Sequence, residues 1–366
     1  MKRIRPIRQS DIKKIVKMIE YVTPGMFPGM IDNKNLIPFP LNILHKLLPL
    51  HLKFMQECYV AVEDNEPFGL ISLVPDGYTK TRWKINRLAL REDAYDTGKQ
   101  LIDYVVNKYS GVGAETFITV IDENCPEAIA LFKNACSFRN CSKINIWECE
   151  SFRPETEKTE FIREALQFDA KRLFALDSEA ILPCLRPSLV KTVMDFRLDL
   201  AGRMMDKFRN YKTDKYVLDN PRNDLLEGLL SIQTVDNIHF WVDITLSLGY
   251  QQYYENLVNF AIKKIRGKNN DAKIYFGVKD HYQTEKFMTE FLASQGFKLC
   301  GNFQVLVKDY WKPIRDYKEK VVPVIAFPDM TSPACNITPF TSEFYTKAKW
   351  FPNLTAKRTH SKFRKT

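Results

Sequence analysis

The sequence lacks several features that would assign it to a class at once. No run of about 18 uncharged apolar residues occurs, so no membrane-spanning helix is expected. None of the eight cysteines lies in a Cys-x-x-Cys pair and no His-x(3–5)-His pattern accompanies them, so we predict no metal site. A P-loop and a Gly-x-Ser-x-Gly motif are also missing. The N-terminus carries no apolar signal segment, and a cytoplasmic location is therefore expected.

Glycine and proline are scarce as well. The 366 residues include 14 glycines and 19 prolines, too few for a collagen-like or low-complexity chain. Apolar residues make up 45% and aromatic residues 13%, which argues against disorder and allows full hydrophobic cores. The length alone predicts two or three domains.

Positive charge is in excess, and much of it lies near the C-terminus. The formal net charge is +10. The segment from Phe340 to Thr366 contains seven lysines and arginines and a single acidic residue, Glu343. Such a segment is either a solvated tail or an arm for RNA, anionic lipid or an acidic partner. No RNA-binding signature supports the nucleic-acid alternative.

An internal repeat organises the rest of the chain. The segment from Ile4 to Met18 can be laid over the segment from Ile162 to Leu176, with arginine, glutamine and aspartate recurring at a spacing of 158 residues. Later elements repeat in the same order: a hairpin, a central strand, a helix, another strand and a final helix. The sequence therefore predicts two copies of one α/β domain with a mixed sheet, over residues 1–152 and 153–312. A basic, proline-punctuated tail over 313–366 would follow.

The order of elements in each copy resembles the GNAT superfamily of N-acyltransferases. The run from Ala128 to Phe138 is similar to that family's closing helix and turn, and Leu88-Ala-Leu90 with Gly98 is similar to its central strand and acyl-CoA loop. The resemblance implies two tandem GNAT domains. It also implies acetyl-CoA as co-substrate and a small-molecule or peptide amine as acceptor.

The same resemblance assigns candidate coenzyme-binding residues in the first copy. In GNAT proteins backbone N–H groups at a helix start hold the coenzyme's pyrophosphate, and glycine allows their close approach. One glycine of the family's pair survives here, Gly98, and the acidic Glu92, Asp93 and Asp96 lie nearby. The candidates that follow are Leu88, Leu90, Thr97, Gly98, Lys99 and Gln100. A purely structural, N-capped helix is the alternative.

Other family positions are altered. In the second copy Tyr253, Tyr254 and Glu255 stand where the phosphate-binding loop should be, so we expect that copy to be non-catalytic. The family's tyrosine acid is replaced by Phe132 or Lys133 in the first copy and by Phe291 or Leu292 in the second, depending on alignment.

At the position where a base is expected, the central strands carry Asn86 in the first copy and Asp243 in the second. Asn86 cannot serve as one, and Asp243 is either a base with a raised pKa or a hydrogen-bonded structural carboxylate. No catalytic residue can be assigned. Two functions remain open: an N-acetyltransferase, or an inactive GNAT pair used for binding or scaffolding.

Overall fold

The computed structural model describes residues 3–11, 14–15, 57–64, 66–77, 81–91, 95–150, 161–197, 212–220, 225–234 and 236–310. Residues 1–312 form one compact unit. The basic tail, Glu92 and Asp93 lie outside the described residues. In the described part no helix is long and apolar enough to cross a membrane.

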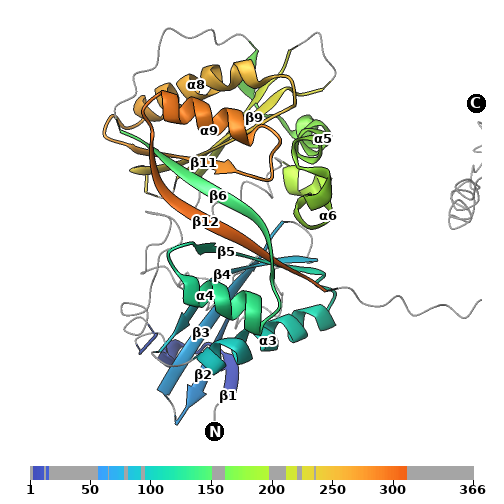
Figure 1. The fold of residues 1–366 in the computed structure, drawn as a ribbon, viewed down its shortest axis with the longest axis vertical. Helices are drawn as coiled ribbons and strands as arrows, with labels where there is room; N and C mark the ends of the chain where they lie inside the picture. Colours follow the sequence, from blue (N-terminus) through green and yellow to red (C-terminus); the bar gives the residue numbers. More distant parts are fainter. Residues whose placement is uncertain are drawn as a thin grey trace, which may run out of the picture. The chain divides into compact units, whose positions relative to one another are not determined.

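Two similar series of elements follow one another along the chain (Figure 1). The first consists of β1 (Arg3–Pro6), β2 (Glu57–Glu63), β3 (Glu66–Pro75), β4 (Arg82–Leu90), α3 (Tyr95–Gly111), β5 (Thr116–Asp122), α4 (Pro126–Ala130) and β6 (Arg139–Cys149). The second consists of β7 (Ile162–Glu164), α5 (Ala170–Ala180), α6 (Arg186–Leu189), β8 (Lys212–Leu218), β9 (Gly228–Thr234), β10 (His239–Leu246), α8 (Tyr254–Arg266), β11 (Lys273–Lys279), α9 (Glu285–Ser294) and β12 (Lys298–Asp309). We refer to these series as the first and second repeat.

Short helical turns complete the described elements. The 3-10 turns are η1 (Gln9–Asp11), η4 (Gln167–Asp169), η5 (Pro183–Leu185), η6 (Val193–Phe196) and η7 (Gln251–Tyr253), and η3 (Leu131–Ala135) is a π-helix that continues α4.

The twelve strands of the described residues join one mixed sheet, and the two repeats exchange their last strands in it. The order is β1-β2-β3-β4-β5-β12-β6-β11-β10-β9-β8-β7. Strand β12 of the second repeat therefore lies between β5 and β6 of the first, and β6 lies between β12 and β11. Figure 1 shows β6 and β12 as the two long strands that run side by side. The described part is thus α/β with a mixed sheet, as the sequence predicts.

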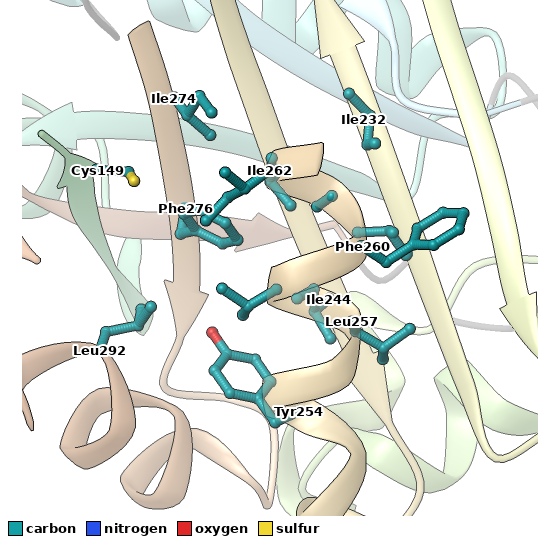
Figure 2. Close-up of a cluster of buried hydrophobic side chains, with 14 of the residues drawn as sticks. Cys149, Ile232, Ile244, Tyr254, Leu257, Phe260, Ile262, Ile274, Phe276 and Leu292 are labelled. Carbon is teal, nitrogen blue, oxygen red and sulfur yellow. The ribbon is translucent and has the colours of Figure 1, made fainter. Parts of the chain in front are cut away.

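Helices cover the sheet because alternate strand residues are apolar. In the first repeat α3 presents Leu101, Ile102 and Val105 at helical spacing to Ile85 and Phe117 of the sheet. The equivalent layer of the second repeat is formed by α8 and α9 (Figure 2). Full burial of each such side chain contributes about 1.5–3 kcal/mol.

The first strands of the two repeats are fixed by the same ion pair. The Arg5 guanidinium donates to both oxygens of Asp11, at 2.6 and 2.9 Å, and Arg163 donates to both oxygens of Asp169, at 2.7 and 2.8 Å. Each aspartate also accepts a backbone N–H three residues earlier. The residues that revealed the repeat in the sequence therefore hold equivalent places in the fold.

Candidate functional site

The central parallel strands of the first repeat separate at their carboxyl ends. Strands β4 and β5 pair only from Arg82↔Thr116 to Ile85↔Thr119, although β4 continues to Leu90 and β5 to Asp122. A β-bulge at Asn86, opposite the step from Ser72 to Leu73, begins the separation. We call the unpaired ends of β4 and β5 the first fork. Beyond Ile85↔Thr119 no backbone pairing between described residues joins the facing edges of β4 and β5.

The second repeat has a corresponding fork, but an ion pair bridges it. Strands β10 and β11 pair from His239↔Lys273 to Asp243↔Gly277 and then separate. Across this second fork the Lys279 Nζ lies 3.0 Å from Asp243 Oδ1. The other oxygen of Asp243 accepts a hydrogen bond from Trp241 Nε1 at 2.9 Å. Asp243 is thus a hydrogen-bonded structural carboxylate here, and its partners oppose a role as base.

The six candidate coenzyme residues of the first repeat fall into three environments. Leu88 and Leu90 are half-buried and pack against the core under α3. Thr97 and Gly98 are buried in the first turns of α3, whereas Lys99 and Gln100 are exposed. Whether they bind a coenzyme stays a prediction.

Gly98 owes its lack of a side chain to packing. A Cβ at this position would lie 2.7 Å from Leu90 Cδ1 and 2.8 Å from Leu131 Cδ2. Glycine therefore allows α3 to approach the end of β4 and the helix that follows β5. Any larger residue would have to displace the ends of these two leucine side chains, so a substitution at Gly98 changes packing as well as any ligand contact.

Comparison with known proteins agrees with this architecture. No protein-family model and no curated protein matches the sequence. Among solved structures, the chain is similar to a tandem GNAT protein from the clavulanic acid biosynthesis pathway, with a TM-score of 0.55 and 10% identity over 86% of this chain and 100% of that one. It is also similar to a GCN5-related N-acetyltransferase from Sphaerobacter thermophilus, with a TM-score of 0.52 and 12% identity over 84% and 95% of the two chains.

The chain has a tandem GNAT fold. At these identities the likeness concerns the fold alone. The resemblance drawn from the sequence is therefore confirmed at the level of architecture. What the two GNAT repeats bind or catalyse has to be argued from their own residues.

In the second GNAT repeat Tyr254 at the start of α8 points into the core, whereas Tyr253 is half-buried and Glu255 is exposed. Tyr254 is 1% exposed and its ring packs edge-on against Phe291, with 5.3 Å between ring centroids. Figure 2 shows Tyr254 among the side chains of this cluster. The difference between the two forks therefore lies less in these tyrosines than in the Asp243–Lys279 bridge.

Hydrogen bonds decide which residue of the first repeat corresponds to Leu292 of the second. The π-helix Leu131–Ala135, with its Cys136 N–H donating to the Leu131 carbonyl, accommodates one extra residue relative to α9. Consequently the Phe138 N–H reaches the Phe132 carbonyl, just as the Phe297 N–H reaches the Leu292 carbonyl. Phe132, not Lys133, therefore corresponds to Leu292. Both side chains are buried hydrocarbons and neither can donate a proton.

The turn after this helix yields a stability prediction. Ser137 has φ = 58°, and its counterpart Gly296 has φ = 76°. An L-residue is strained in this left-handed region, so Ser137→Gly should stabilise the protein by about 0.5–1 kcal/mol, measured as a higher urea midpoint. The matched reverse change, Gly296→Ser, meets no atom within 4 Å and should destabilise it through the backbone alone. A lower midpoint for Ser137→Gly would contradict this account.

Metal ligands do not gather in the described part of the chain, where no three His, Cys, Asp or Glu side chains form a cluster. Of the seven cysteines described there, Cys58, Cys136 and Cys149 are buried, whereas Cys184 and Cys300 are exposed.

Proposed function

We propose that the first repeat binds acetyl-CoA at the first fork and transfers the acetyl group to an amine in the cytoplasm. The observation that carries this proposal is the contrast between the forks. The second is bridged by Asp243 and Lys279, whereas no ion pair between described residues crosses the first. The facing edges of β4 and β5 suit the amides of an extended pantetheine chain. Helix α3 starts at Tyr95, shortly after β4 ends, and its positive end suits a diphosphate.

The roles left to the chain's own residues are binding and orientation. Bound acetyl-CoA would supply an activated thioester. The edge of β4 would hold that group in place, while Thr97, Gly98, Lys99 and Gln100 at the start of α3 would lie near the phosphates. The amine would lose a proton to water and attack the thioester carbonyl. Because Phe132 cannot act as an acid, the departing thiolate would take its proton from water. Acetyl transfer can proceed without a protein acid at this position, because a thiolate is a good leaving group.

Calorimetric titration with acetyl-CoA tests the binding step. We expect one site per chain, and Lys99→Glu should weaken its affinity roughly fivefold to tenfold, because it puts negative charge beside the phosphates. Lys171→Glu makes the same charge change on an exposed position of α5 and should leave the affinity unchanged. No binding at millimolar acetyl-CoA, or equal effects of both variants, would refute the proposed site.

An inactive binding or scaffolding module is the second candidate. The observation that favours it is the hydrocarbon side chain at the tyrosine position of both repeats, Phe132 and Leu292. Release of free coenzyme A thiol, measured with a panel of small amines and amine-bearing peptides, separates the two. Binding of acetyl-CoA without amine-dependent thiol release would favour the inactive module.

A further inference from the structure

An arginine stands at the first fork on the sheet face opposite α3. Arg87 follows the bulge of β4 and pairs with Ser72 of β3, which in turn pairs with Cys58 of β2. Its neighbours Leu88 and Ile85 pack under α3, whereas Cys58 and Ala89 belong to a separate apolar cluster on the other face. Arg87 therefore projects on the sheet face opposite α3, where Ile15 packs against Cys58 and Ala89.

This arginine has no counter-ion among the described residues. The residue is half-buried, and its Nη1 atom is inaccessible to solvent and has no hydrogen-bond partner. Burial lowers the pKa of Arg87, and among the described residues the Cys58 thiol is the charge partner that opposes this shift. An unpaired guanidinium in such surroundings is costly, and a ligand anion would remove much of that cost.

The second repeat shows what normally fills this position. Arg87 and Asp243 are equivalent, because each pairs with a serine of the preceding strand, Ser72 or Ser231. The last residues of the neighbouring strands, Asp122 and Lys279, are equivalent too, since β5 and β11 both have seven residues. The charges are thus reversed between the repeats.

Only in the second repeat do the two charges meet. Asp243 and Lys279 form their 3.0 Å bridge, but no ion pair joins Arg87 to Asp122. One Asp122 oxygen instead accepts the Asn124 N–H at 2.9 Å. The bulge at Asn86 ends the β4–β5 pairing before Arg87, which keeps the two charges on opposite sides of the first fork.

We infer that Arg87 binds the carboxylate of the acceptor and that Asp122 faces its ammonium group, so that the acceptor is an amino-acid-like zwitterion. A planar guanidinium matches a carboxylate with two parallel hydrogen bonds. Opposite charges on the two sides of the fork suit a molecule that carries both signs. The inference rests on the proposed function and specifies its substrate class.

Matched acceptors test the inference. With acetyl-CoA and a panel of amino acids, each paired with its carboxamide, the best acid should exceed its carboxamide about 100-fold in kcat/KM. Arg87→Gln should remove about 100-fold for the acid and leave the carboxamide within about threefold, and Arg87→Lys should restore part of the loss. Arg3→Gln, at an exposed position of β1, is the control and should change neither rate.

A melting experiment gives a readout that needs no activity. Without ligand, Arg87→Gln should melt about 2–5 °C higher than the natural protein, because an unpaired buried charge is removed. The preferred amino acid should raise the melting temperature of the natural protein and not that of the variant. A variant that melts lower and keeps the ligand-induced shift would mean that Arg87 serves the fold, and would overturn the inference.

The outcomes separate this inference from the proposed function. Equal rates for acids and carboxamides, or a preference for phosphoethanolamine over every amino acid, would overturn the carboxylate site while acetyl transfer stands. An Arg87-dependent melting shift with an amino acid, in a protein that binds no acetyl-CoA, would support the carboxylate site and refute the transferase.

Discussion

Asp169→Asn is expected to destabilise the protein by about 3 kcal/mol, one of the largest effects of a single substitution in this chain. The Asp169 side chain is fully buried and accepts two hydrogen bonds from Arg163 and one from the Leu166 N–H. An asparagine can keep the contact with the backbone N–H but meets the Arg163 guanidinium with an NH₂ group. Since Asp219 still pairs with Arg163, the loss should fall at the lower end for a broken buried ion pair.

Urea unfolding of matched variants measures this effect. Asp236→Asn removes a carboxylate from the exposed pair with His239 and should cost less than about 1 kcal/mol. Equal losses for Asp169→Asn and Asp236→Asn would contradict the importance assigned to the buried ion pair.

Acid should remove the contribution of Asp169 in the natural protein. Burial alone would raise the pKa of Asp169, but the hydrogen bonds from Arg163 and Leu166 outweigh it and hold the pKa below 3.8. A carboxyl whose pKa is lower in the folded state stabilises above its unfolded pKa and loses that contribution as the pH falls through the folded pKa. The stabilities of the natural protein and Asp169→Asn should therefore converge below pH 3.8.

Local signals made the repeat visible in the sequence. Arg5 with Asp11 and Arg163 with Asp169 are six residues apart in each case, and each pair closes a short strand onto its first turn. Such contacts depend on neighbouring residues, so both copies preserve them. The exchange of β6 and β12 depends on residues more than 150 positions apart, such as Ile146 and Gly301, and no short pattern encodes it.

The sequence predicts only part of the candidate site, because the other part depends on contacts between strands that are distant in the sequence. The resemblance assigns Gly98 to phosphate binding, whereas the structure shows it packed closely against Leu90 and Leu131. No sequence pattern singles out Arg87 and Asp122, because their importance lies in a comparison between paired strands. Aligning the repeats through the bulge at Asn86 shows them as the charge-reversed equivalents of Asp243 and Lys279. An alignment without that inserted residue cannot show both equivalences.

Separating the two repeats should abolish the folding of each, which is the largest effect expected here. The sequence predicts a boundary near residue 152, but in a fragment of residues 1–152 the strand between β5 and β6 would be missing. That strand is β12, which pairs with β5 from Phe303↔Asp122 to Asp309↔Thr116 and with β6 along its other edge. Its Leu306 and Val307 are fully buried. Without β12, two strand edges and an apolar layer would be exposed, which favours aggregation.

Fragment complementation tests this expectation. Residues 1–152 alone should show no cooperative urea transition, whereas coexpression with 153–312 should restore a soluble complex, because each fragment supplies the strand that the other lacks. As a control, a protease site placed within residues 151–160 of the intact chain should allow cleavage without separation of the pieces on gel filtration. Cooperative unfolding of 1–152 on its own would show that the first repeat is an independent domain, with β6 able to pair directly with β5.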